Sequence, residues 1–117
     1  DELTLTGETH ICEIRDGLLN KYEITPEQFG FKRCGAEDLK GGTPKENALI
    51  TRNILTGADK GPRRDVVVLN AAMALYLGID DCSVAECVKT AEDLIDSGKA
   101  ASKLEELRII SNGMVVQ

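Results

Sequence analysis

Residues 65–77, DVVVLNAAMALYL, are almost continuously apolar and set the arrangement of the whole chain. The run Val66-Val67-Val68 alone favours a strand. The residues that follow, Asn70-Ala71-Ala72-Met73-Ala74-Leu75, are rich in strong helix formers, and Gly78 is a typical helix end. We therefore predict a helix from Asp65 to Leu77 that is buried on most of its sides.

Three further helix starts share one capping pattern. In each, a Ser or Thr hydroxyl can accept a hydrogen bond from the backbone N–H three residues on, and an acid or amide there can return the bond. The pairs are Thr25 with Gln28, Thr43 with Glu46, and Ser83 with Glu86. They predict a short turn ending at Gly30, a helix from about Pro44 to Thr56, and a helix that ends before Gly98.

Apolar residues at helical spacing mark the faces of the last two helices. Val84, Val88, Ala91 and Ile95 form one stripe, and Ala100, Leu104 and Leu107 form the next, with Glu105, Glu106 and Arg108 facing outward. Asn112-Gly113 then predicts a turn, and Met114-Val115-Val116 a short strand or a frayed end.

Residues 9–24 carry a hairpin pattern, because Asp16-Gly17 separates two β-prone runs as the central pair of a type I′ turn. A two-residue loop places Ile14 opposite Leu19 and Ile11 opposite Tyr22, on alternate faces. We expect one face to be covered and the other to be partly exposed. Leu3 and Leu5 alternate with threonines and predict a short additional strand before Gly7.

The composition indicates one globular domain spanning residues 1–117. The chain is 42% apolar and 29% charged, and its net charge of -6 opposes non-specific binding to nucleic acid or to an anionic membrane. No segment approaches the roughly 20 consecutive apolar residues of a membrane span, and no leader precedes the first strand. We expect a soluble, cytoplasmic protein, and the missing initiator Met suggests a piece of a larger one.

The cysteines predict neither zinc nor a disulfide framework. Cys12, Cys34, Cys82 and Cys87 form no CxxC pair, and His10 is the single histidine. Their even number permits disulfides, but several helices can bury a core without them. We expect four reduced thiols that pack as small apolar side chains.

Six short stretches, taken in order and spacing, resemble the C-terminal third of the anthranilate phosphoribosyltransferase family over roughly residues 1 to 107. They are Asp1-Glu2-Leu3, Thr25-Pro26-Glu27-Gln28-Phe29-Gly30, Glu46-Asn47-Ala48, Gly61-Pro62-Arg63-Arg64-Asp65, Leu69-Asn70-Ala71-Ala72 and Ser97-Gly98-Lys99-Ala100. Each is weak alone, and the series is specific. The resemblance identifies the fold family as that of nucleoside phosphorylases and phosphoribosyltransferases.

The resemblance implies the distal part of an α/β catalytic domain, which as an isolated chain is an α+β fold. A hairpin at residues 3–24 precedes a helical region at 25–110 and a tail at 111–117. The family transfers phosphoribosyl from phosphoribosyl diphosphate to anthranilate in tryptophan biosynthesis, as a homodimeric enzyme. Its phosphate loop and its anthranilate-binding residues lie upstream of these segments, so we expect the chain alone to be inactive and assign no catalytic residue.

Asp1 and Glu2 are the candidate metal ligands. From the residues alone, such a pair at a chain end is a solvated charge, and in an extended segment the two side chains point to opposite faces. The resemblance implies that this Asp-Glu pair ligates the Mg2+ ions that accompany the diphosphate of phosphoribosyl diphosphate. Mg2+ suits the arrangement because it is commonly held by one or two carboxylates together with substrate phosphates and water.

Four other polar features are interpreted as structural. Lys60, Arg63 and Arg64 form a compact basic cluster at a helix N-terminus, where cations oppose the helix dipole, so we expect them to turn to solvent or to a carboxylate. Asn70 lies amid apolar residues, so its amide should tether a loop or the facing helix. His10 is expected to be a surface histidine. Asp80-Asp81 complements the dipole of the following helix.

The residues also allow two other functions. A relative in the same fold family, such as a pyrimidine nucleoside phosphorylase or a phosphoribosyltransferase-like paralogue, would differ in the acceptor pocket. The Asp-Glu pair favours a diphosphate donor over a single phosphate. From a different class, the chain could be a non-catalytic assembly module that retains only the packing residues. For each of these functions we expect the chain to self-associate. The other predicted helices are too few and too short to bury the apolar helix of residues 65–77 completely.

Overall fold

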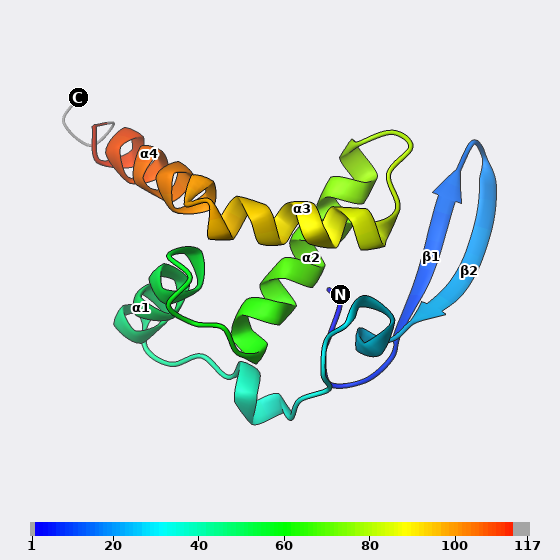
Figure 1. The fold of residues 1–117 in the computed structure, drawn as a ribbon, viewed down its shortest axis with the longest axis horizontal. Coiled ribbons are helices and arrows are strands. Elements are labelled where there is room, and N and C mark those ends of the chain that lie inside the picture. Colours follow the sequence, from blue (N-terminus) through cyan, green and yellow to red (C-terminus); the bar gives the residue numbers. More distant parts are fainter. Residues whose placement is uncertain (1, 114–117) are drawn as a thin grey trace.

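The computed structural model describes residues 2–113 and places helix α2 (Pro62–Gly78) at the centre of the molecule, with the other elements arranged around it (Figure 1). Helix α3 (Val84–Asp96) crosses α2 and packs most extensively against it. The β1–β2 hairpin stands at one end and helix α4 (Lys99–Gly113) at the other, which gives an elongated shape of 48 × 34 × 25 Å. The predicted α+β chain of one hairpin followed by helices is confirmed.

Helix α2 is the centre of the core, but it is buried along one face and not on most of its sides as its apolar run predicted. Val68, Leu69 and Ala72 are almost completely buried, whereas Val67 and Leu77 are exposed. The α3 residues packed against this face are Cys87, Val88, Ala91 and Ile95. The predicted α3 stripe is therefore confirmed, with Cys87 more deeply buried than Val84.

The hairpin has the predicted turn and register. Strands β1 (Thr9–Arg15) and β2 (Leu18–Ile24) are antiparallel, and Asp16 and Gly17 have φ angles of 51° and 75°. Positive φ at both central residues is the signature of a type I′ turn. Ile14 pairs with Leu19 and Ile11 with Tyr22, as predicted.

The two faces of the hairpin differ in burial. Ile11 and Tyr22 are half-buried on the face toward α2, whereas Ile14 and Leu19 remain 74% and 59% exposed. The expectation of one covered and one exposed face is therefore confirmed.

The strand predicted at Leu3 and Leu5 is absent from the described residues, and that prediction was wrong. The segment is instead held by non-sheet contacts, since Asn70 bonds the backbone of Leu3 and the Cys34 N–H donates to the Leu5 carbonyl at 3.1 Å. Leu5 is completely buried in the core. The alternation of Leu and Thr thus marks a segment that inserts one side chain between helices without pairing to a strand.

The capping pairs predicted at Thr43 and Ser83 form in full. At Thr25 only the bond returned by Gln28 forms, because the Gln28 N–H donates to the Thr25 carbonyl and not to its hydroxyl. Two 3-10 turns, η1 (Pro26–Phe29) and η2 (Ala36–Leu39), precede helix α1 (Pro44–Leu55). At α1 the Glu46 N–H donates to Thr43 Oγ1 at 3.3 Å and Glu46 Oε2 accepts from the Thr43 N–H at 2.7 Å. Ser83 and Glu86 repeat this pattern at α3, and Gln28 Oε1 accepts from the Thr25 N–H at η1.

Helix α4 departs from the prediction at its end. Gly98, with φ of 79°, separates it from α3, and the helix continues through Asn112-Gly113 where a turn was expected. Leu107 was assigned to a packed stripe, but it is 61% exposed, because α4 extends beyond the helices that would cover it. The prediction for Met114-Val115-Val116 lies outside the described residues.

Among the helices of residues 2–113, none is long and apolar enough to cross a membrane.

Substitution Asn70→Ala should lower the free energy of unfolding by about 2 kcal/mol, because it leaves the partly buried Leu3 N–H and carbonyl without their partner. Urea unfolding followed by circular dichroism measures this change. Asn112→Ala, at an exposed position of α4, is the matched control and should stay within about 0.5 kcal/mol of the unsubstituted chain. Equal effects of the two substitutions would show that the Asn70 contacts contribute nothing specific.

Candidate functional site

The position of Glu2 is fixed through its neighbour Leu3. The side chain of Asn70 on α2 binds both polar groups of the Leu3 backbone: Oδ1 accepts from the N–H at 3.0 Å and Nδ2 donates to the carbonyl at 2.9 Å. Nδ2 also donates to the Val66 carbonyl one turn earlier, at 2.9 Å. The prediction that Asn70 tethers a loop is confirmed, and we call this three-bond contact the Asn70 clasp.

The clasp places an exposed carboxylate at the start of the described chain. Glu2 directly precedes Leu3 and its side chain is exposed. Asp1, the other predicted metal ligand, lies outside the described residues. Within residues 2–113, no group of three or more His, Cys, Asp or Glu side chains could hold a metal ion.

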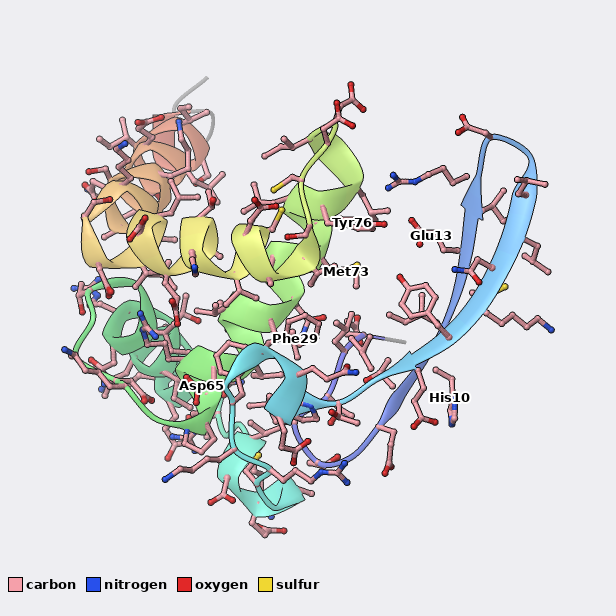
Figure 2. All side chains as sticks on the ribbon, turned by 45° about the vertical axis from the view of Figure 1, so that its right-hand side comes forward. His10, Glu13, Phe29, Asp65, Met73 and Tyr76 are labelled. Carbon is pink, nitrogen blue, oxygen red and sulfur yellow. The ribbon has the colours of Figure 1, made fainter. Side chains whose placement is uncertain are left out.

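A polar network joins the hairpin to α2 and was not anticipated from the sequence. Tyr76 Oη donates to Glu13 Oε1 at 2.7 Å, and Arg15 Nη2 lies 3.3 Å from the same oxygen. The Arg15 guanidinium carbon lies 5.2 Å from the centre of the Tyr76 ring, within reach of a cation–π contact. Figure 2 shows Glu13 pointing from β1 toward Tyr76 on α2.

The network changes the pKa values of Glu13, Tyr76 and Tyr22. The hydrogen bond from Tyr76 lowers the pKa of Glu13, with a smaller contribution from Tyr22, and the same bond raises the pKa of Tyr76. Burial, followed by the charge of Glu13, raises the pKa of Tyr22. These residues border a cavity of about 330 Å3 between the hairpin and α2, which Ile11, Met73 and Leu77 also line.

The strand alternation gives the face on which Glu13 lies, but not its partner on α2. In a strand His10, Cys12 and Ile14 share one face, which leaves Glu13 on the opposite face with Ile11. That face is the one toward α2, so a carboxylate there requires a donor. The His10 face points away from the helices (Figure 2). The His10 side chain is 84% exposed and its Nδ1 lies 3.2 Å from Glu23 Oε2 across the ribbon, which confirms it as a surface residue.

The two arginines of the basic cluster at the start of α2 hold separate segments together. Arg64 Nη2 donates to Asp96 Oδ1 of α3 at 3.0 Å, which confirms the expected pairing with a carboxylate. Arg63 departs from the expectation, because its Nη2 donates to the Lys40 carbonyl at 2.9 Å and does not turn to solvent or to a carboxylate. The Nε atoms of both arginines are buried and make no hydrogen bond within the described residues. Burial also raises the pKa of Asp65 beside them.

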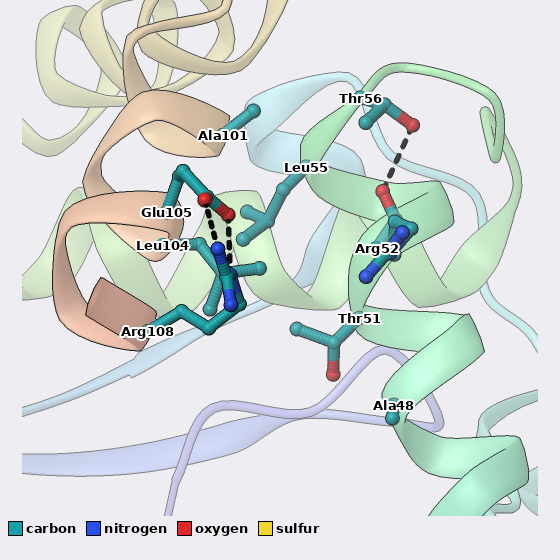
Figure 3. A pocket seen from close by; sticks show the side chains of 9 residues that line it. All are labelled: Ala48, Thr51, Arg52, Leu55, Thr56, Ala101, Leu104, Glu105 and Arg108. Atoms are coloured by element: carbon teal, nitrogen blue, oxygen red, sulfur yellow. Dashed lines mark hydrogen bonds and ion pairs between the residues drawn. The ribbon is translucent and has the colours of Figure 1, made fainter. Parts of the chain in front are cut away.

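A second cavity, of about 430 Å3, lies between α1 and α4 (Figure 3). Its floor is apolar, with Leu55 and Leu104. On its rim Arg108 forms a two-point contact with Glu105, through Nε at 2.9 Å and Nη2 at 2.6 Å. Arg108 and, more weakly, Arg52 lower the pKa of Glu105. The groove thus carries two guanidinium groups and one carboxylate, and no nucleophile and base lie within hydrogen-bonding reach of each other there.

The sequence that builds the hairpin, the central helix and the Asn70 clasp matches a family model. A family model described as "Glycosyl transferase family, a/b domain" matches residues 1–101. The chain belongs to this family.

The curated relatives that the chain resembles are named anthranilate phosphoribosyltransferase. The protein of Endomicrobium trichonymphae is 52% identical over 106 residues, which cover 91% of this chain and 31% of that protein. The protein of Methanosarcina acetivorans is 46% identical over 117 residues, all of this chain and 31% of that protein. The chain thus spans about a third of the length of these relatives, and the resemblance predicted from the sequence is confirmed.

Solved structures agree in fold. The anthranilate phosphoribosyltransferase of Thermus thermophilus matches 91% of the chain with a TM-score of 0.81 and 42% identity. The enzyme of Saccharomyces cerevisiae in complex with 4-fluoroanthranilate matches 90% with a TM-score of 0.81 and 29% identity. A variant of the yeast enzyme, described with Mg bound, matches with a TM-score of 0.79. In each case this chain covers 31% of the matched chain.

Substitution Tyr76→Phe should raise the Glu13 pKa toward its ordinary value of 4.5, because it removes the largest cause of the shift. Tyr22→Phe, the matched control, should raise it less. Since folding lowers this pKa, the contact contributes stability above a pH of about 4.5 that is lost as the pH falls through the folded value. Carboxyl 13C NMR titration measures the pKa, and a larger shift in Tyr22→Phe than in Tyr76→Phe would contradict the assignment.

Proposed function

We propose that this chain is part of an enzyme that transfers the phosphoribosyl group from phosphoribosyl diphosphate to the amine of anthranilate, in tryptophan biosynthesis. The observation that carries the proposal is the 52% identity over 106 residues to a protein named for this activity. The yeast structure with 4-fluoroanthranilate supports the acceptor, because that ligand is a close analogue of anthranilate. The chain supplies one partial domain, residues 1–117, of a cytoplasmic enzyme.

The chemistry requires a diphosphate to leave the anomeric carbon of the ribose while the anthranilate nitrogen bonds to that carbon. Negative charge grows on the leaving oxygens, and groups that stabilise this charge lower the barrier. We propose that Asp1 and Glu2 stabilise this charge indirectly, as ligands of Mg2+. When bound, Mg2+ neutralises charge on the diphosphate without a proton transfer.

The residues present fit such an ion. Glu2 is exposed and is not followed by a flexible linker, because the next residue is held by the Asn70 clasp. Mg2+ needs only one or two protein carboxylates when substrate phosphates complete its shell. The yeast variant with Mg bound supports the choice of metal. In this proposal Asn70 is a positioning residue, since it acts on the metal pair only through the Leu3 backbone.

We also propose that the chain by itself does not catalyse the transfer. Its sequence holds no glycine-rich strand-to-helix phosphate motif, and the Gly41-Gly42 pair serves the α1 start, where the Gly42 N–H donates to Asn47 at 2.7 Å. Positioning of donor and acceptor supplies much of a transferase's barrier reduction. The remaining two thirds of the relatives' length are the proposed source of both binding sites.

A chimera tests the function and the metal pair together. Residues 1–107 of this chain should replace the corresponding third of the Thermus thermophilus enzyme with retention of anthranilate phosphoribosyl transfer, measured as loss of anthranilate fluorescence. In that chimera, Asp1→Asn with Glu2→Gln should lower turnover by about a hundredfold or more at saturating Mg2+. Glu37→Gln, an exposed glutamate of η2, is the matched control and should leave turnover unchanged.

Calorimetric titration with phosphoribosyl diphosphate separates the two parts of this test. The double variant should lose the Mg2+ dependence of donor binding while its thermal unfolding stays unchanged. A folded chimera without transfer would contradict the proposed function. Transfer that survives the double substitution within a few-fold would contradict the metal assignment alone.

We further propose that the chain self-associates through apolar side chains that this third of the relatives' length leaves exposed. Large apolar side chains are exposed in two groups, at the hairpin tip and at the end of α4, and also at separate positions such as Leu49 and Leu77. At the tip they are Ile14, Leu18 and Leu19, and on α4 they are Leu107, Ile109 and Ile110. Exposed apolar surface at both ends of one molecule favours association, against the opposing net charge of -6.

Sedimentation equilibrium should therefore give a mass above the 12.7 kDa of the monomer that rises with concentration. Ile14→Thr with Leu19→Thr retains strand propensity at the hairpin, and Leu107→Gln with Ile110→Gln retains helix propensity on α4. The pair that restores the monomer identifies the contact surface. A monomer at all concentrations over about a hundredfold range would contradict the proposal.

A further inference from the structure

Two cysteine sulfurs lie in direct contact at the start of α3. The Sγ atoms of Cys82 and Cys87 are 2.9 Å apart. Ser83 is the N-cap of the helix, so Cys82 precedes the cap and Cys87 is the fourth helical residue. These are the two positions that a hydrophobic staple brings together across a capped helix start. The contact is therefore built by the helix start itself.

The two thiols differ in access to solvent. Cys87 is completely buried and belongs to the core cluster with Val88 and Ala91, whereas Cys82 is half-buried in the loop between α2 and α3. The contact with Cys82, followed by burial, raises the pKa of Cys87 to about 11. Cys87 is thus a protonated and shielded thiol beside a more accessible one.

The remaining cysteines have no such arrangement. Cys12 is exposed on the outer face of the hairpin, and Cys34 is half-buried in the loop that binds Leu5. Within residues 2–113, the Cys82–Cys87 contact is the single one between two sulfurs. A disulfide has a sulfur–sulfur bond of about 2.05 Å, so closure requires a movement of less than about 1 Å.

We propose that Cys82 and Cys87 form an oxidisable thiol pair that a peroxide converts into an intrachain disulfide. Nothing in the proposed transferase chemistry uses these sulfurs. Once formed, the bond links the loop before Ser83 covalently to the buried face of α3. That loop contains Asp81, a non-glycine residue with φ of 56°.

The peroxide oxidises the thiol pair in two steps. The Cys82 sulfur, as the accessible nucleophile, attacks one peroxide oxygen; an S–O bond forms, the O–O bond breaks, and the leaving hydroxide takes up the thiol proton to become water. The Cys87 sulfur then attacks the Cys82 sulfenic acid; the S–S bond forms, the S–O bond breaks, and the Cys87 proton leaves with the hydroxyl as a second water. The two sulfurs lose two electrons, and these reduce the peroxide.

The test uses the chain with Cys12→Ser and Cys34→Ser, which removes the two other thiols. Hydrogen peroxide should convert this variant into a product of one covalent chain, lighter by two hydrogen atoms. This product should no longer react with iodoacetamide. Glu86 lies between the two cysteines, so cleavage after glutamate should leave two peptides that stay joined until a reductant is added. The oxidised chain should melt about 5 °C or more above the reduced one.

Single substitutions in the same background give the controls. With Cys87→Ala, peroxide should leave a sulfenic acid at Cys82 that dimedone captures, and with Cys82→Ser it should leave Cys87 unmodified. The proposal is overturned by a sulfinic acid at Cys82 beside an alkylatable Cys87, by disulfide-linked dimers as the main product, or by two intact thiols after free cysteine in the same solution has been oxidised.

Discussion

The contact between the Asn70 amide and the Leu3 backbone is the constraint on which the arrangement of this chain depends. It joins the start of the chain to the middle of the central helix, 67 positions apart in sequence. Because Leu5 enters the core two residues later, the hydrogen bonds and the apolar burial fix the same short segment. An amide suits the role, since it donates and accepts at once, as the partly buried N–H and carbonyl of Leu3 require.

Features governed by local physics could be predicted from the sequence. The Asp16-Gly17 turn fixed the hairpin register, because positive φ at two adjacent positions admits few residue types. The cap pairs at Thr43 and Ser83 located two helix starts within a residue, since donor and acceptor lie three positions apart. Helix propensity over Asn70–Leu75 outweighed the strand preference of three valines.

Features that depend on distant partners could not be predicted in the same way. Leu3 and Leu5 show strand alternation, but a strand needs a neighbour, and the neighbour here is a helix side chain. The Glu13–Tyr76 contact joins residues 63 positions apart, so its polar partner is invisible to local pattern. For the proposed metal pair, sequence reasoning alone supported only a solvated charge at Glu2, and the resemblance to a family supplied the role.

The hairpin adds little to the common core, so its unfolding is only weakly coupled to that of the helices. Ile24 is its one buried apolar side chain among the described residues, and it lies outside the cluster formed by Leu5, Phe31 and the helices. Tyr76 and Glu13 provide the polar link to α2. The hairpin can therefore open as a separate unit while the helices stay folded. Its amide protons should exchange through a local opening of lower free energy than the opening that exposes the amides of α2.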